Sequence, residues 1–329
     1  MSDDLQQDTF LGLLHLLADG AYHSGEELGQ WLGVSRAAVW KQVQKLEQLG
    51  VELSSQRGKG YCIKGGLELL QERAILAAMS AVAAPPRLII LPETDSTNSY
   101  LINARGLPNG SVCLAERQLA GRGRRGRAWV SPFARNIYLS MVWRFEGGAS
   151  VLEGLSLAVG VAIARALASL GITGIALKWP NDILYRGKKL AGILLEMSGD
   201  PAGECQVVIG VGVNVHMGKD AVIDQPWTDL ASIAADQQLT APDRNALAAA
   251  LISELHSLLQ TFAARGFAHW RPLWMSAAAY IGDHVCVLTA NNEVCGTLVG
   301  VDDSGALVLS VEGHNRVFHG GEVSLRRRE

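Results

Sequence analysis

The chain has 329 residues, of which 48% are hydrophobic and 19% charged, and its formal net charge is −3. This composition excludes a disordered chain, and the near-neutral charge argues against a surface that coats nucleic acid without selectivity. The length exceeds that of one typical core, so we expect two or three domains. No apolar run looks long enough to span a bilayer, and the acidic start lacks the basic segment of a secretory signal, so we expect a cytoplasmic protein with no membrane partner.

The five cysteines are scattered, at positions 62, 113, 205, 286 and 295. They form no Cys-x-x-Cys pair and no Cys/His spacing suited to zinc. We therefore expect small buried thiols in a reducing compartment and no structural metal.

The N-terminal segment is typical of a winged helix-turn-helix. Residues 9–20, 24–32 and 36–49 predict three helices, with Ser35 as the cap of the third. Two strand-like pieces within 51–64 then predict a hairpin, or wing. This order of elements favours DNA binding, with the third helix as the recognition helix.

Basic residues are concentrated in the same segment. Residues 1–35 contain no Lys or Arg, whereas 36–64 carry six basic and two acidic residues. The alternative is a small helical domain whose lysines are only solvated. We expect the DNA contacts to come from Ser35, Arg36, Lys41, Gln42, Lys45, Arg57 and Lys59.

After a helix-like stretch from Leu67 to Ala83, Pro85-Pro86 is a natural boundary. The next part predicts strands over 88–91, 111–115, 137–143, 192–197 and 206–215, and helices over 152–170 and 245–264. Because strands do not alternate strictly with helices, an α+β fold is favoured over a parallel doubly wound sheet. From about residue 282, five short strands predict a small SH3-like β-barrel. The expected domains are 1–66, 67–275 and 276–329.

Gly121-Arg-Gly-Arg-Arg-Gly126 matches the Gly-x-Gly-x-x-Gly pattern of dinucleotide-binding turns, but its setting is wrong for one. Such a turn opens a helix, whereas the residues that follow contain Pro132 and no helical stripe. Glycines provide backbone freedom and arginines bind anions. We expect a mobile loop that orders around an anionic nucleotide intermediate; a solvated surface loop is the alternative.

Two more groups of polar residues lie beside predicted strands. Lys178-Trp-Pro-Asn-Asp182 and Lys188-Lys-Leu-Ala-Gly192 bring lysines and Asp182 toward one hairpin. Ser96-Thr-Asn98 follows one strand, and Glu116 and Gln118 follow another. Short hydroxyl and amide side chains at strand ends can bind a small neutral polar group.

Taken in order, these motifs together with Gly210-x-Gly-x-Asn214 resemble those of biotin–protein ligases. With the helix-turn-helix, the chain is similar over essentially its whole length to the bacterial bifunctional biotin ligases and biotin-operon repressors. The resemblance implies a central mixed α/β ligase domain related to class II synthetase-like folds, placed between the winged helix-turn-helix and the SH3-like domain.

The resemblance also implies an activity. Biotin and ATP, with Mg²⁺, would give biotinyl-5′-AMP and pyrophosphate, and biotin would then pass to a lysine of the biotin carboxyl carrier protein of acetyl-CoA carboxylase. The adenylate would also be the corepressor, favouring a homodimer that binds operator DNA. Three alternatives stay open: a ligase without operator binding, a biotin-sensing regulator without catalysis, and a lipoate ligase.

Residue roles follow from the family pattern. The catalytic residues would be Lys189, Arg122, Arg124 and Asp182, with Asp182 positioning magnesium or accepting from the incoming lysine. Biotin would contact Ser96, Thr97, Asn98, Gln118, Arg122, Gly123, Arg124, Lys189 and Gly192. The nucleotide would contact Arg122, Arg124, Trp129, Lys178, Asn181, Asn214, Met217 and Trp227, and 217–227 would form a second loop over the adenine.

Overall fold

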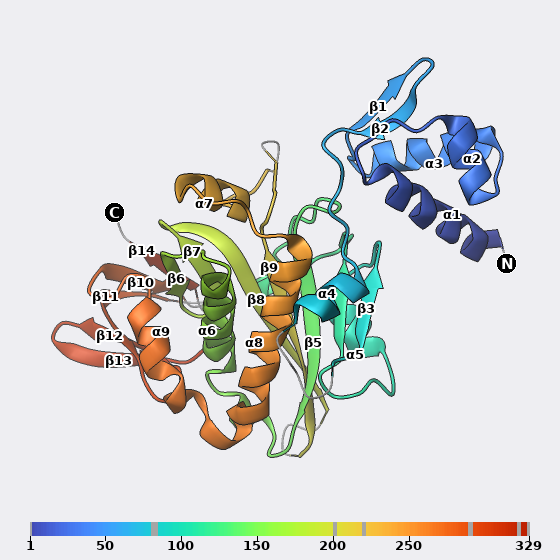
Figure 1. Ribbon diagram of the computed structural model, residues 1–329. Coiled ribbons are helices and arrows are strands. Elements are labelled where there is room, and N and C mark those ends of the chain that lie inside the picture. Colours follow the sequence, from blue (N-terminus) through green and yellow to red (C-terminus); the bar gives the residue numbers. More distant parts are fainter. Residues whose placement is uncertain are drawn as a thin grey trace.

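The computed structural model describes residues 2–79, 85–199, 203–218, 222–288, 292–320 and 324–327. Figure 1 shows an N-terminal helical domain, a central sheet covered by helices, and a smaller C-terminal sheet beside it. The predicted α+β organisation is confirmed.

The N-terminal domain has the predicted winged helix-turn-helix elements. They are α1 (Ser2–Leu17), α2 (Gly25–Leu32), α3 (Arg36–Gln48), β1 (Leu53–Gln56) and β2 (Gly60–Ile63), the two strands pairing as a projecting hairpin (Figure 1). Ser24 and Glu27 form a capping box on α2, and the Ser35 side chain accepts from Ala38 N at 3.3 Å. Each cap satisfies a backbone N–H group in the first turn of its helix that has no partner within the helix. The two helices therefore begin directly after the serines.

The central sheet has seven strands in the order β3-β4-β5-β9-β8-β7-β6. Only β3 and β4 pair in parallel among the pairs within this sheet. In that spatial order the strands are Leu88–Leu91, Val112–Ala115, Ile137–Phe145, Cys205–Val213, Lys188–Gly199, Asp182–Tyr185 and Ile175–Lys178. Strand β8 starts at Lys188, before the predicted start at 192, because Lys188 and Lys189 pair with β7 across a tight hairpin.

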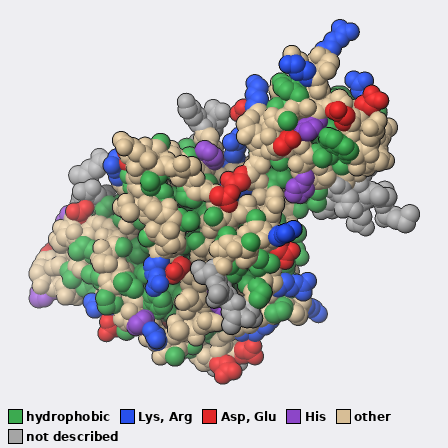
Figure 2. Space-filling model, in the orientation of Figure 1, with side chains coloured by type: hydrophobic (Ala, Val, Ile, Leu, Met, Phe, Trp, Pro, Cys, Tyr) green, Lys and Arg blue, Asp and Glu red, His purple; other side chains and the backbone are tan. Residues whose placement is uncertain are grey.

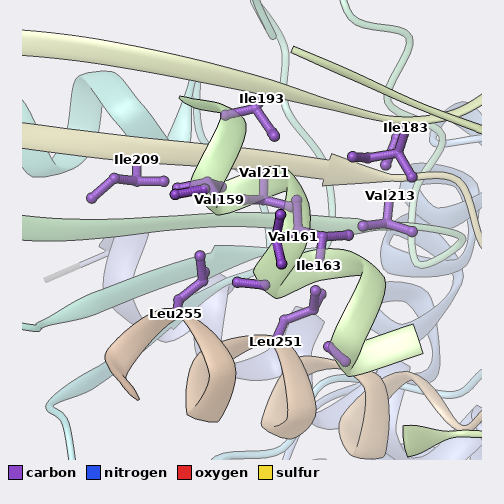
Figure 3. Close-up of a cluster of buried hydrophobic side chains, with 14 of the residues drawn as sticks. Val159, Val161, Ile163, Ile183, Ile193, Ile209, Val211, Val213, Leu251 and Leu255 are labelled. Atoms are coloured by element: carbon purple, nitrogen blue, oxygen red, sulfur yellow. The ribbon is translucent and has the colours of Figure 1, made fainter. Parts of the chain in front are cut away.

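One face of this sheet is covered by α6 (Leu155–Ser169) and α8 (Arg244–Arg265). Figure 3 shows valines and isoleucines of α6 between the sheet residues Ile193, Ile209 and Val211 and the α8 residues Leu251 and Leu255. Burying each such side chain contributes about 1.5–3 kcal/mol relative to exposure, so this layer is the main core.

Two helical segments, Ser150–Ser169 and Arg244–Arg265, are long and apolar enough to cross a membrane by length and composition alone. The expectation that no run reaches this length was therefore wrong. Buried residues make up 56% and 50% of the apolar windows in the two segments, because they pack on each other and on the sheet.

The remaining helices are short. They are α4 (Glu72–Ala78), α5 (Thr97–Asn103), α7 (Leu230–Asp236), α9 (Arg271–Ala277) and the 3₁₀ turns η1 (Arg124–Gly126), η2 (Ala149–Leu152) and η3 (Phe267–His269). The helix predicted over 67–83 was too long at its start. Residues 67–71 are extended because their backbone groups bond to the central domain, and residues 80–84 lie outside the described part.

The C-terminal segment contains the five short strands that were predicted. They are β10 (His284–Leu288), β11 (Glu293–Val301), β12 (Leu307–Val311), β13 (His314–Phe318) and β14 (Ser324–Arg327), and they form one antiparallel sheet in the order β13-β12-β11-β10-β14. Trp179 Nε1 donates to Gly305 O at 3.1 Å, which fixes this sheet against the β6–β7 end of the central domain.

The expectation of five free thiols was wrong for one pair. Cys286 on β10 and Cys295 on β11 are cross-strand partners, and their sulfurs are bonded to each other. The hairpin register places them opposite each other, which the spacing alone did not show. Cys62, Cys113 and Cys205 are buried free thiols, as expected.

Candidate functional site

The sheet face that α6 and α8 do not cover carries small and polar side chains. Alternate residues of a strand point to opposite faces, so Ser140, Gly192, Gly210 and Gly212 share this second face. A cavity of about 860 Å³ lies over it. Its walls include Ser96, Thr97, Asn98, Gln118, Arg122, Gly123, Arg124, Trp129, Lys178, Asn181, Asp182, Lys189 and Gly192. All of these were predicted site residues.

Glycines form the floor of the cavity. A Cβ at Gly212 would lie 2.6 Å from the Trp129 ring, and a Cβ at Gly210 would lie 2.4 Å from Asn98 Oδ1. At Gly192 the nearest atom, also of Trp129, is at 3.0 Å. The missing side chains let Trp129 and Asn98 rest directly on the strands. Gly210 and Gly212 belong to the Gly210-x-Gly-x-Asn214 motif but were not predicted as site residues, although their spacing of two on a predicted strand was a usable signal.

One end of the cavity is a network of neutral polar groups. Thr97 N and Oγ1 donate to Gln118 Oε1 at 2.9 and 3.1 Å, and Ser140 Oγ donates to Asn98 Oδ1 at 2.6 Å. Ser96, Thr97 and Asn98 are buried at the first turn of α5. Because these groups hold one another in place, this end is preorganised for a small neutral ligand.

The other end of the cavity is cationic. Lys189 Nζ lies 2.7 Å from Asp182 Oδ1, and Arg124 Nη1 donates to Asn181 Oδ1 at 3.4 Å. Burial lowers the pKa of Lys178 and of Arg124 below their ordinary values. Closely spaced cations with partly lost hydration would bind a polyanion strongly.

The Gly121–Arg127 loop lies over this cavity as a closed turn. Gly123 N donates to Arg127 O at 2.7 Å, and Trp129 N donates to Gly121 O at 2.8 Å. Within it, η1 is a single 3₁₀ turn, and no long helix follows. The geometry thus agrees with rejecting a dinucleotide-binding turn. The Arg122 side chain turns toward the neutral end, where its Nη2 donates to Ser99 Oγ and Glu196 Oε1, both at 3.0 Å.

Three residues that were predicted to contact the nucleotide do not line the cavity. Asn214 Nδ2 donates to Thr228 O at 3.1 Å, Met217 Sδ accepts from Asn136 at 2.8 Å, and Trp227 is a bridge partner of Lys189. They hold the segment around Pro226 against β8, and 222–226 of that segment line the cavity. The predicted loop 217–227 is described only in part, because 219–221 lie outside the described residues.

Three basic wall residues were not predicted from the sequence. Arg125 and Arg127 belong to the loop itself, whereas Arg326 comes from β14 of the C-terminal sheet. The arginine run at 326–328 was the available signal. Its meaning depends on the fold, which brings β14 beside the central domain.

Glu116, part of a quoted motif, lies outside the cavity and binds the linker between the first two domains. Its carboxylate accepts from Leu70 N at 2.6 Å and pairs with Arg244 at 2.8 Å, and both side chains are at most 5% exposed. The Arg244 guanidinium also bonds to Glu68 O and Asn136 O. Burial, and then the adjacent Asp243, raise the pKa of Glu68 to about 7. We call Glu68, Glu116, Arg244 and Asn245 the linker cluster.

The predicted DNA contacts lie on the surface of the N-terminal domain. Ser35, Arg36, Lys41, Lys45, Arg57 and Lys59 are exposed, whereas Gln42 is half-buried. Figure 2 shows basic side chains gathered at the projecting end of this domain. Lys45 Nζ lies 4.7 Å from the Phe10 ring centroid, so it also packs on α1. Trp40, 53% exposed on α3, was not predicted.

Three segments of the chain match known protein families. Residues 11–62 match a family described as HTH domain, 89–214 match the biotin/lipoate A/B protein ligase family, and 280–326 match the biotin protein ligase C-terminal domain.

Individual proteins agree with these matches. The bifunctional ligase/repressor BirA of Escherichia coli is 41% identical, covering 97% of this chain and 98% of its own. The biotin–[acetyl-CoA-carboxylase] ligase of Paracoccus denitrificans is 38% identical over 71% of this chain and 98% of its own. The biotin protein ligase of Aquifex aeolicus, solved with biotin and ATP, superposes with a TM-score of 0.64 at 29% identity, over 74% of this chain and 99% of its own.

Proposed function

We propose, from the premise that the chain belongs to the family of bifunctional biotin ligase/repressors, that it activates biotin with ATP and transfers it to a lysine of a biotin carboxyl carrier protein. The observation that carries this proposal is one cavity that has both a neutral polar end and a cationic end. Biotin has a neutral ureido group at one end and a carboxylate at the other. The carboxylate would therefore point toward Lys189, where ATP phosphates would also bind.

The first step is displacement at phosphorus. A biotin carboxylate oxygen attacks the α-phosphate, the bond to the β-phosphate oxygen breaks, and biotinyl-5′-AMP and pyrophosphate form. No enzyme nucleophile is needed, but two anions must approach each other. Lys189, Arg124 and Lys178 would neutralise this charge in a partly dehydrated site.

Asp182 holds Lys189 in place at 2.7 Å and is the carboxylate nearest to it. Mg²⁺ usually binds to one or two carboxylates together with substrate phosphates, and Asp182 and Asp224 in the cavity wall suit that pattern. When bound, the ion would offset charge on the phosphates. In the second step the carrier lysine would attack the acyl carbon and AMP would leave, and Asp182 would accept the lysine proton.

An acyl adenylate hydrolyses readily, so water must be excluded until the carrier arrives. We assign this role to the Gly121–Arg127 loop and Trp129, together with 222–226, which also line the cavity. Ordering of these segments around the adenylate would also favour the homodimer that binds operator DNA through two winged helix-turn-helix domains. We further propose domain boundaries near 66 and 275 and a cytoplasmic location.

The test is transfer of labelled biotin to a purified carrier domain, with and without ATP. Replacing Lys189 with alanine should lower adenylate formation by about 10²–10³-fold, the usual cost of losing one charge-stabilising group. Lys188→Ala is the matched control, because that neighbour is exposed and should keep wild-type rates. Wild-type labelling by Lys189→Ala would refute the assignment.

Two alternatives have their own decisive results. A biotin-sensing regulator without catalysis would consume no ATP in the presence of biotin. A ligase without operator binding would give no gel shift with its own biotin-gene promoter, even with biotinyl-5′-AMP. Because the matched family also includes lipoate ligases, lipoate should be tested as the competing acid.

A further inference from the structure

Glu196 on β8 is a charged side chain that the proposed reaction does not use. It stands on the cavity face of the strand, two positions beyond Leu194, but is not itself a wall residue. Its carboxylate, however, contacts two residues of the cavity wall, Asn98 and Arg122. Oε2 accepts from Asn98 Nδ2 at 2.7 Å, and Oε1 accepts from Arg122 Nη2 at 3.0 Å.

The contact with Asn98 determines which way that amide faces. A carboxylate only accepts, so it holds the Asn98 NH₂ group on its own side and leaves Oδ1 toward Ser140 Oγ at 2.6 Å. Leu194 O accepts from the same NH₂ group at 3.3 Å. The direction of the hydrogen bonds at the neutral end therefore depends on Glu196.

The contact with Arg122 ties the Gly121–Arg127 loop to the sheet. Arg122 is the second residue of the loop, and its guanidinium reaches Ser99 on α5 as well as Glu196. The pair also cancels the Arg122 charge at this end. The neutral end thus carries no net charge from this pair, whereas Lys178, Lys189 and Arg124 lie at the other end.

We propose that Glu196 is a positioning residue of the ligase reaction: it orients the Asn98 amide for the neutral part of biotin and anchors the loop that retains the adenylate. This inference rests on the proposed ligase function. The two roles are separable, because glutamine can still accept from Asn98 but cannot form the ion pair with Arg122.

The experiment compares Glu196→Gln, Glu196→Ala and Arg122→Met in the full-length protein. The KM for biotin, compared with kcat, reports on the orientation of the Asn98 amide. Escape of the adenylate, read as biotinylation of serum albumin in place of the carrier domain, reports on the loop. Glu204→Gln, an exposed glutamate in the turn before β9, is the matched control and should equal wild type in both measurements.

For Glu196→Ala we expect KM for biotin to rise about tenfold with a smaller change in kcat, the size of one hydrogen bond to a charged group. Glu196→Gln should keep KM within about threefold, because its hydrogen bond to Asn98 is retained. It should still leak adenylate as much as Arg122→Met. Adding Glu196→Gln to Arg122→Met should then have almost no further effect on leakage.

Wild-type KM in Glu196→Ala, or additive leakage in the double variant, would overturn the inference. So would rescue of both defects by glutamine, since the charge would then play no part. If Glu196→Ala does not fold, as judged by its thermal midpoint, Glu196→Gln and the double variant still decide the matter. Failure of the wild-type enzyme to label the carrier would instead refute the proposed function.

Discussion

At the scale of single residues, glycines shape the cavity because they have no side chain. Gly210 and Gly212 stand on β9 with ordinary strand geometry, so backbone freedom does not explain them. What matters is the close approach of Asn98 and of the Trp129 ring. A methyl group at either position would occupy space that those side chains now fill.

Gly212→Ala is therefore expected to displace Trp129 and to raise KM for ATP about tenfold or more, since a misplacement near 1 Å can cost up to 10²-fold. The fold should persist, because the displaced ring borders a cavity. Steady-state kinetics with varied ATP checks this. Gly320→Ala is the control, because nothing lies within 4 Å of its Cβ position. An unchanged KM would show that the ring position is unimportant.

At the scale of elements, the linker cluster joins the start of α8, the end of β4 and residues 68–71. Asn245 Oδ1 accepts from Gln71 N at 2.7 Å, and Asn245 Nδ2 donates to Leu69 O at 3.1 Å. Leu69 is buried together with Phe133 and residues of α1 and α3. The extended linker thus lies between the DNA-binding domain and the strands β4, which precedes Gln118, and β5, which carries Tyr138.

Removing one partner of the buried Glu116–Arg244 ion pair should lower the free energy of unfolding considerably. Arg244→Met leaves Glu116 charged and buried, so we expect a loss of about 3–5 kcal/mol of stability. Chemical denaturation followed by fluorescence measures it. Arg165→Met breaks the more exposed pair with Glu254 and should cost about 1 kcal/mol or less. Equal losses in the two variants would argue against a larger contribution of the buried pair to stability.

Glu68 makes the stability contributed by the linker cluster depend on pH. Its pKa is raised from 4.5 to about 7 on folding, so the folded chain holds the proton more tightly than the unfolded chain. The resulting stabilisation is complete below about pH 4.5 and is lost as pH rises through about 7.

Glu68→Gln removes this titration. Between pH 5 and pH 8 the thermal midpoint of the wild type should fall relative to that of the variant. Asp243 and Arg244 face Glu68, and the cap contact of Asp243 to Ala246 N is kept in both proteins. Parallel profiles for the two proteins would show that Glu68 does not titrate in this range.

At the scale of the whole molecule, the proposed ligase site and the proposed DNA contacts lie on separate surfaces. The wing tip with Arg57 and Lys59 projects away from the central sheet (Figure 1). Phosphate contacts of this kind contribute affinity that salt weakens.

Replacing both Arg57 and Lys59 with alanine should weaken operator binding and lower the slope of log K against log salt by about 2. Biotin transfer should be unchanged. Gel-shift titrations at several salt concentrations test the change in operator binding, and the carrier assay tests whether biotin transfer is unchanged. Full operator affinity in the double variant would exclude wing contacts with phosphate.

Local signals in the chain determined most of the elements. The cap at Ser35, apolar periodicity and polar turns predicted the winged helix-turn-helix, the main strands and the C-terminal sheet. Ordered motifs also indicated most of the cavity wall. These features depend on neighbours in the chain, which is why sequence alone reached them.

Contacts that depend on strand register or on the packing of separate segments were decided only by the tertiary structure. Glu196 with Arg122, Arg244 with Glu116, the Cys286–Cys295 pair and Arg326 at the cavity all depend on strand register and domain packing. The Gly121–Arg127 loop shows both sides of this division. Its composition predicted an anion-binding lid, but only the folded sheet determines that Arg122 is bound to Glu196 while Arg124 lies beside Asn181. The pairing of charges depends on distance in space, and distance along the chain does not determine it.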